Sequence, residues 1–343
     1  MYTRDMVQQV HRNLRVGLCT TLILSLFIPL MAAAQFGDTA GSMNSFSLSV
    51  NPQYPAPYSQ AMVSAVSSSL DLANAMMIVS VDGKKIYQGN ARPVAVPLGR
   101  AGSVTKVVVD ISSGGADYSQ TVSVQPQDVV LIVEPVSSAP PLYPGKPLVP
   151  LEGSVRVVAM ANLKNAAGTP LNPSALSYSW TVDTTQVASA SGIGKTALMV
   201  ASPLQYRARS VSIAISSTDG TLVGGASLSL SPEEPSLRIY ENDPLLGIRF
   251  DHALPNAYTI TGAEVSLYAA AFSLPTTYGA PLLQWFLDGD MVQTGSSITL
   301  RPTGSGRGTA SLSLTATAGP YTTASANLGL SFGAAKSSNF FGL

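Results

Sequence analysis

Cysteine and histidine are nearly absent from this chain. Among its 343 residues there is one cysteine, Cys19, and there are two histidines, His11 and His252. A zinc site needs several thiolate or imidazole ligands, and the sequence does not supply them. Because the only cysteine lies close to the start, the rest of the chain has neither a thiol nucleophile nor a disulfide. Any stability of that part must come from its hydrophobic cores.

Charged residues are also scarce, at 11% of the chain, against about 25% in an average soluble protein. Lysine and arginine together number 19, as do aspartate and glutamate, so the formal net charge is zero. Without a basic or acidic excess, the sequence predicts neither nucleic acid nor an acidic substrate as a partner. A hydrophobic content of 45% argues against a disordered chain.

The first residues predict export. Three arginines, an apolar run and three alanines follow one another: Arg4, Arg12 and Arg15, then Val16 to Met31, then Ala32 to Ala34. This is the order of a secretory signal peptide, so residues 1–34 are expected to be a cleaved leader and the protein extracellular or cell-surface. The alternative is an uncleaved membrane anchor, although the run contains Pro29 and is shorter than the roughly 20 residues of a spanning helix. The absence of Asn-x-Ser/Thr sequons fits a bacterial source.

Three later segments follow one pattern. They are MMIVSVDGKKI (Met76–Ile86), SYSWTVDTTQV (Ser177–Val187) and LLQWFLDGDMV (Leu282–Val292). Each is a short apolar strand that ends at an aspartate, and an apolar residue lies three positions before it: Val79 and Asp82, Trp180 and Asp183, Trp285 and Asp288. The copies recur about every hundred residues, the size of one immunoglobulin-like sandwich. We therefore expect both tryptophans in the centres of hydrophobic cores.

Alternating strands surround each copy. Two strands around a glycine-bearing turn follow it, in Ser103–Val124, Arg209–Leu230 and Gly308–Leu330. Two strands precede it in each unit: Phe46–Val50 and Ala61–Val66, Val129–Val133 and Val155–Ala161, Leu237–Tyr240 and Glu264–Ala271. Alternation with period two indicates antiparallel sheets with one packed and one solvated face. The prediction is an all-β chain of three tandem antiparallel sandwiches at 35–134, 135–235 and 236–333, followed by a flexible tail at 334–343.

The tandem pattern resembles the Ig-like and PKD-like repeats of exported bacterial surface proteins. The residues that carry the resemblance are YSWTVD, LQWFLDGD and the hairpins named above. The chain departs from the PKD core, roughly Tyr-x-Trp-Asp-Phe-Gly-Asp-Gly, because Thr181 and Phe286 follow the tryptophans. The resemblance implies the sandwich fold and leaves function open, since such folds have many roles.

Two short motifs imitate sites that bind or react. Gly194-Lys195-Thr196 spells the end of a phosphate-binding loop, but Ser189 stands where that motif needs glycine, and a strand-like run follows instead of a helix. In the repeat register, Gly192–Thr196 matches TGSSITL (Thr294–Leu300), so both are predicted to be turns that lead into a strand. GSGRG (Gly304–Gly308) imitates a serine elbow, but Arg307 intervenes in a predicted β-turn.

His252 is the one imidazole beyond the leader. Asp251 is predicted to be a poor orienting partner for it, because adjacent residues of a strand point to opposite faces. The sequence therefore predicts no catalytic, cofactor-binding or metal-binding residue and no enzyme. Calcium binding at the domain joints remains an alternative, with six acidic residues as candidate ligands: Glu233, Glu234, Glu241, Asp243, Asp288 and Asp290. Calcium needs six to eight oxygen ligands, and no D-x-D-x-D run supplies them.

These observations favour an exported, non-enzymatic structural or adhesive protein of a cell surface. The expected partner is a protein or a glycan and not a nucleic acid. Contact with a membrane is expected only if the leader stays uncleaved. One alternative is a glycan- or protein-binding module that uses exposed tyrosines, for which the candidates are Tyr54, Tyr58, Tyr143, Tyr206, Tyr278 and Tyr321. Another is an accessory component of a pilus or secretion assembly. The tail AAKSSNFFGL is either without function or a docking peptide that uses Phe340 and Phe341.

Overall fold

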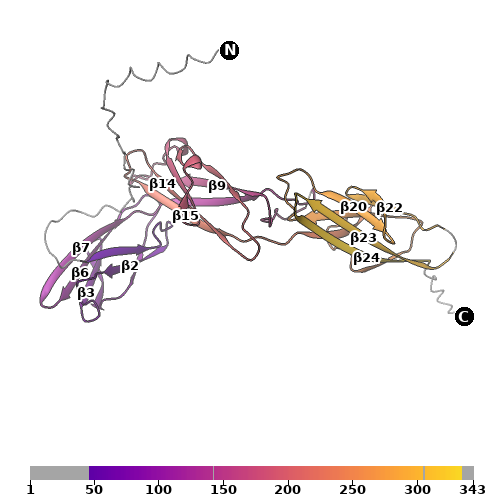
Figure 1. The fold of residues 1–343 in the computed structure, drawn as a ribbon. Coiled ribbons are helices and arrows are strands. Elements are labelled where there is room, and N and C mark those ends of the chain that lie inside the picture. The colour runs from indigo at the N-terminus through magenta and orange to yellow at the C-terminus, as the bar shows by residue number, and fades with distance from the viewer. Residues whose placement is uncertain (1–45, 142, 304–305, 334–343) are drawn as a thin grey trace, which may run out of the picture. The chain divides into compact units, whose positions relative to one another are not determined.

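The computed structural model describes residues 46–141, 143–303 and 306–333. The predicted leader with Cys19, part of the GSGRG motif and the tail at 334–343 lie outside these ranges. Strands dominate the described residues, as Figure 1 shows, and two single-turn 3₁₀ helices interrupt them at Pro173–Ala175 and Ala188–Ala190. Within the described ranges, no helix has the length and apolarity needed to cross a membrane. The expected all-β class is confirmed.

The first group of strands forms two antiparallel sheets. One sheet has the order β1-β2-β5, from β1 (Ser47–Asn51), β2 (Gln60–Val66) and β5 (Val94–Pro97). The other has the order β4-β3-β6-β7, from β3 (Met76–Val81), β4 (Lys84–Asn90), β6 (Thr105–Ser113) and β7 (Ala116–Val124). Their inner residues share one hydrophobic core, which includes Val63 and Val96 from the first sheet and Met77 and Val107 from the second.

The second group repeats this arrangement. Its smaller sheet has the order β13-β9-β8, from β8 (Asp128–Pro135), β9 (Ser154–Asn162) and β13 (Ala197–Ala201). The larger sheet has the order β11-β10-β14-β15, with β12 also paired to β10, from β10 (Ser177–Val182), β11 (Thr185–Gln186), β12 (Gly192–Ile193), β14 (Arg209–Ser216) and β15 (Val223–Leu230). The division expected between residues 134 and 135 falls inside β8, whose ladder to β9 runs from Asp128 to Pro135. That pairing places β8 in the second sandwich.

The third group is the largest. One sheet has the order β17-β16-β19-β22, from β16 (Ser236–Asp243), β17 (Gly247–Ile248), β19 (Val265–Phe272) and β22 (Ser297–Leu300). The other has the order β18-β24-β23-β20-β21, from β18 (Ala257–Ile260), β20 (Leu282–Leu287), β21 (Asp290–Thr294), β23 (Gly308–Ala318) and β24 (Thr322–Phe332). β18 pairs with β24 in parallel. The expectation of antiparallel pairing throughout is wrong at this ladder, and the sequence pattern did not predict β18.

Each sandwich has its own core, with a copy of the repeated motif at its centre. Trp180 and Trp285 are fully buried, at 0% exposure, in the second and third cores. Val79 takes this position in the first core, where Met77 and Ile111 are the large fully buried side chains. The prediction that both tryptophans are core residues is confirmed.

Candidate functional site

The repeated aspartates adopt the same unusual backbone conformation. Their φ angles are 48° at Asp82, 55° at Asp183 and 51° at Asp288, all in the left-handed region. Few residues other than glycine adopt it, and aspartate is among the more tolerant because its short side chain can bond to nearby backbone. Each aspartate directly follows a strand that enters the core, so the tight turn reverses the chain at the sandwich edge.

Each of these aspartates also makes a reciprocal pair of hydrogen bonds with a residue of the antiparallel neighbour of its strand, which is β6, β14 or β23. The Asp82, Asp183 and Asp288 N–H groups donate to the carbonyl oxygens of Lys106, Ser210 and Ser311 at 2.9, 2.8 and 2.8 Å. The N–H groups of those three residues donate back to the carboxylate Oδ1 atoms at 2.9, 3.0 and 2.7 Å. We call this arrangement the aspartate clasp. The repeated aspartate therefore has a structural task.

The segment that imitates a phosphate-binding loop has a structural task as well. Trp180 Nε1 donates to the Lys195 carbonyl at 2.9 Å, and Trp285 Nε1 donates to the Gly295 carbonyl at 2.9 Å. The Gly194 N–H donates to the Leu176 carbonyl at 2.9 Å, so it is not available to a phosphate. Strand β13 follows at Ala197 in place of a helix. The match to Thr294–Leu300 is confirmed, and Gly194 lies in the predicted turn, whereas Gly192 and Ile193 form strand β12.

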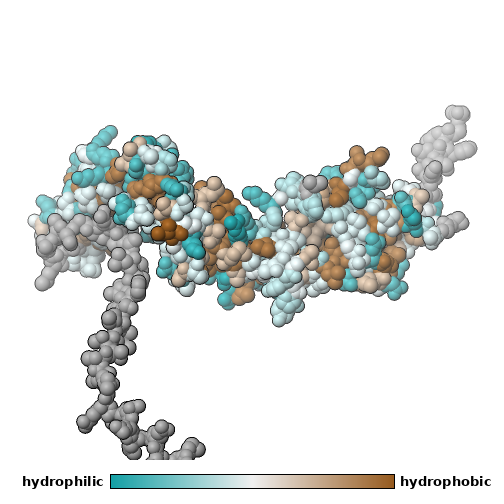
Figure 2. All heavy atoms as spheres, turned by 90° about the horizontal axis from the view of Figure 1, so that it is seen from above, coloured by the Kyte–Doolittle hydropathy of each residue, from teal (hydrophilic) through white to brown (hydrophobic). Residues whose placement is uncertain are grey.

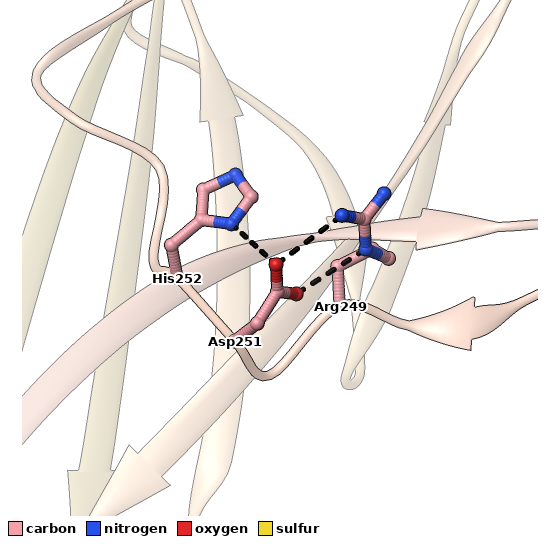
Figure 3. Close-up of polar contacts among 3 residues, drawn as sticks. All are labelled: Arg249, Asp251 and His252. Atoms are coloured by element: carbon pink, nitrogen blue, oxygen red, sulfur yellow. Dashed lines mark hydrogen bonds and ion pairs between the residues drawn. The ribbon is translucent and has the colours of Figure 1, made fainter.

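His252 lies in a surface cluster with Arg249 and Asp251 (Figure 3). Its Nδ1 is 2.9 Å from Asp251 Oδ2, and Arg249 donates to both oxygens of the same carboxylate, through Nε and Nη2, at 3.2 Å each. The expectation that Asp251 is a poor partner was wrong. The two residues lie in a turn after β17, where the alternation of strand side chains does not apply.

This cluster has the electrostatics of a solvated ion group. Hydrogen bonds from Arg249 and then His252 lower the pKa of Asp251 to about 2, and Asp251 in turn raises the pKa of Arg249. The side chains of Asp251 and His252 are 56% and 59% exposed. Across the described ranges, Asp251 is the one side chain that hydrogen-bonds to His252. A catalytic triad needs a nucleophile hydrogen-bonded to its histidine, and the described residues place none beside His252.

Three of the six acidic residues considered for calcium have protein partners of their own. Asp243 Oδ1 accepts the N–H groups of Leu245 and Leu246 at 2.8 and 2.9 Å, and these bonds lower the pKa of Asp243. Asp288 belongs to the clasp, and Glu234 Oε1 accepts from Gln205 Nε2 at 3.2 Å. In the part of the chain that the structure describes, no group of three His, Cys, Asp or Glu side chains could hold a metal ion.

The six candidate tyrosines have different surroundings. Four are well exposed: Tyr58 at 79%, Tyr206 at 89%, Tyr278 at 63% and Tyr321 at 88%. Tyr54 is half-buried, and desolvation raises its pKa. Tyr143 lies edge-on to Phe250 and Phe272, with ring centroids 6.2 and 5.1 Å apart.

Two of the exposed tyrosines are brought to one place. The Tyr278 ring lies against Gly319, so closely that a Cβ there would be 2.9 Å from Tyr278 Cδ2. Gly319 is in the β23–β24 turn, two residues before Tyr321. The structure thus places Tyr278 beside the turn that carries Tyr321.

Sequence reasoning missed an apolar surface. Apolar residues form brown patches among polar ones in Figure 2, and the exposed large ones include Val130, Ile132, Met160 and Met199. All four belong to the sheet β13-β9-β8. The signal was present in VVLIV (Val129–Val133), because an uninterrupted apolar run predicts a strand that is covered on both faces.

Similarity to known proteins is found among solved structures, and it is low. No protein-family model matches the chain, and no curated protein matches it in sequence. Among solved structures, the three N-terminal domains of the bacteriophage RB49 Highly Immunogenic Outer Capsid protein (Hoc) are 12% identical and cover 85% of this chain and 100% of their own, with a TM-score of 0.24. The central fibronectin-III array of RIM-binding protein is 10% identical and covers 83% and 94%, with a TM-score of 0.28.

Scores this low carry no argument about fold or function. The fold is a tandem array of immunoglobulin-like sandwiches. This conclusion rests on the paired sheets and the three cores described above. The closer resemblance to bacterial PKD-like repeats stays an interpretation of the sequence.

Proposed function

We propose that this chain is an exported, non-enzymatic structural or adhesive protein of a cell surface. The observation that supports it best is the use made of the repeated polar residues. Asp82, Asp183 and Asp288 bond to backbone N–H groups, and the indoles bond to backbone carbonyls. The residues repeated most faithfully therefore maintain the sandwiches. His252, the residue best suited to acid–base chemistry, lies in an exposed ion cluster.

Export and exposure can be tested together in a bacterial host. We expect the tagged full chain to be cleaved by protease added to intact cells, and a matched variant without residues 2–34 to stay protected inside. Intact cells that display the chain should aggregate or attach to a surface more than cells that produce the deletion variant. Protection of the full chain from the protease would overturn export. Surface display without any change in attachment or envelope integrity would overturn the adhesive or structural role alone.

Glycan binding is a second candidate, favoured by the position of Tyr278 beside the turn that carries Tyr321. Exposed aromatic rings on one face could stack on a sugar ring, which a solitary tyrosine does less well. The test is a glycan array probed with the purified chain, then with Tyr278→Ala and Tyr321→Ala. Tyr206→Ala is the control, since Tyr206 is at least as exposed as the other two but belongs to the second sandwich. A signal lost in the first two variants and kept in the third supports this candidate, and no signal above background rejects it.

A further inference from the structure

The sheet β13-β9-β8 is apolar on both faces. Its inner side chains, among them Val155, Val157 and Leu198, belong to the second core. Its outer side chains are also apolar over most of the sheet, and we call them the outer apolar face: Val130, Ile132, Val158, Met160, Ala197 and Met199. Four of them are 37–58% exposed, namely Val130, Ile132, Met160 and Met199. Such a face is the pattern of a strand covered on both sides.

Strand register makes these side chains neighbours. Val130 pairs with Met160, and Ile132 pairs with Val158, which also pairs with Ala197 on the other side. Glu134 and Arg156 form an ion pair at one end of the same face. The outer positions of the opposite sheet are polar by contrast, and include Ser179, Thr181, Ser212 and Ser227. The apolar character is therefore specific to one face of the second sandwich.

The third sandwich shows how the same face is covered there. The Ala159 N–H donates to the Thr196 carbonyl and the Ala269 N–H donates to the Ser296 carbonyl, so these two alanines are equivalent. Val158 precedes Ala159 and pairs with Ile132, and Tyr268 precedes Ala269 and pairs with Tyr240. The pair Ile132–Val158 is therefore equivalent to the pair Tyr240–Tyr268.

Phe250 covers that tyrosine pair. Its ring centroid lies 5.2 Å from that of Tyr240 and 6.0 Å from that of Tyr268, in edge-on geometry at 70° and 90°. Tyr240 is 7% exposed as a result. On the outer face of the first sandwich, Ser49 pairs with Ser64 and needs no cover. Among the described residues, Ile132 of the equivalent pair in the second sandwich is 37% exposed, so this pair lacks the cover that Phe250 gives in the third.

The size of the face indicates what could cover it. Three strands about 4.8 Å apart and five residues long, at about 3.3 Å per residue, span an area of roughly 10 Å by 17 Å. That is far less than the roughly 800 Å² per partner of a stable interface between folded proteins. A short segment with one or two aromatic anchors matches this area better than a second folded domain does.

We propose that the outer apolar face binds the segment Lys336–Leu343 of this chain, KSSNFFGL, with Phe340 or Phe341 over Ile132 and Val158 as Phe250 lies over Tyr240 and Tyr268. An aromatic ring on a β-branched pair buries a large apolar area. The segment comes from a neighbouring copy and so links copies into an assembly. In its own molecule, β24 runs from Thr322, which bonds to Glu152 of the second sandwich, to Phe332, about 33 Å away. The eight residues from there to Phe340 span at most about 28 Å and cannot reach back to Val158.

The test uses a fluorescent peptide of residues 334–343 and the chain with Phe340→Ser and Phe341→Ser, so that its own segment does not compete. We expect saturable anisotropy, at least about tenfold weaker binding when Ile132→Ser and Val158→Ser are added, and no binding by a peptide with both phenylalanines replaced by serine. Met62→Ser is the matched control, an outward methionine of β2 in the first sandwich. Absence of binding, or equal binding by the Ile132/Val158 variant, would overturn the proposal.

A second measurement guards against misfolding of that variant. A photoreactive phenylalanine analogue at position 340 of the otherwise unchanged chain should crosslink to peptides from β8 or β9. Crosslinks between copies, identified by mixing isotope-labelled chains, support the docking, and crosslinks confined to one molecule would overturn it. Crosslinks confined to another strand, such as β21, would show that the segment binds elsewhere.

Discussion

Asp288 and Ser311 are joined by two hydrogen bonds that run in opposite directions. The Asp288 N–H donates to the Ser311 carbonyl at 2.8 Å, and the Ser311 N–H donates to Asp288 Oδ1 at 2.7 Å. The same relationship joins Asp183 to Ser210 and Asp82 to Lys106. One side chain thus connects the end of a core strand to its antiparallel neighbour, β6, β14 or β23, in all three sandwiches.

The clasp should be sensitive to the identity of its aspartate. Asp288→Ala removes the carboxylate acceptor and places alanine in the left-handed region, at a combined cost of about 2–4 kcal/mol in unfolding free energy. Asp288→Asn keeps an acceptor and tolerates the conformation, so it should cost less than half as much. Denaturant unfolding of the full chain measures both. Asp290→Ala, at an exposed position two residues away, is the control, and an equal loss in it would show that the clasp contributes nothing special.

Trp285 contributes both its volume and its indole N–H. Trp285→Ala should lower the unfolding free energy of the third sandwich by about 3–5 kcal/mol, because it leaves a large cavity. Trp285→Phe should cost about 1–3 kcal/mol, since it fills most of the space but leaves the Gly295 carbonyl without its donor. Thermal unfolding followed by calorimetry separates the two variants. An unchanged unfolding transition in Trp285→Ala would contradict the core position.

The segment Gly192–Thr196 should respond to substitution as a structural turn and not as a phosphate-binding loop. Gly194 has a φ of 70°, and a Cβ there would lie 3.2 Å from the Ser174 carbonyl oxygen, so Gly194→Ala should destabilise the chain by about 1–2 kcal/mol. Lys195→Ala should be nearly neutral, because Lys195 acts through its backbone carbonyl. ATP with magnesium should leave the unfolding temperature of the unaltered chain unchanged. A rise on nucleotide addition that Lys195→Ala abolishes would restore the phosphate-loop interpretation.

The Arg249–Asp251–His252 cluster predicts a pH dependence at acid pH. The folded-state pKa of Asp251, about 2, lies below the value of roughly 3.9 expected for an unfolded aspartate. Its contribution to stability is therefore complete above about pH 4 and is lost as the pH falls toward 2. Carboxyl NMR titration should show the Asp251 pKa rising toward its ordinary value in Arg249→Ala. Added salt should also raise the pKa of Asp251, because its carboxylate is exposed and the charges around it are screened. A pKa that changes in neither experiment would mean that the pairing does not form in solution.

Much of the architecture was predictable from residue pattern. Period-two alternation in segments such as Val107–Ile111 predicted antiparallel strands, and the spacing of Asp82, Asp183 and Asp288 predicted three units. Buried strands impose this alternation directly on the chain, so it can be read without coordinates. Trp180 and Trp285 were correctly assigned to cores for the same reason.

Other features depended on contacts between residues far apart in the chain. The parallel pairing of β18 with β24 joins residues 257–260 to residues 329–332, and no local pattern marks such a ladder. Asp251 was misjudged as a partner of His252 because a strand was assumed where the chain turns.

The sequence by itself determined that the chain is all-β, that it is built in repeats, and that it is poor in the residues of catalysis, since composition and periodicity are local properties. Only the tertiary structure decided what the repeated residues do. It made the aspartates backbone clasps and showed that Phe250 covers the Tyr240–Tyr268 pair while the equivalent Ile132–Val158 pair lies open. Whether an apolar face is covered depends on which distant segment folds across it, and alternation along one strand carries no record of that.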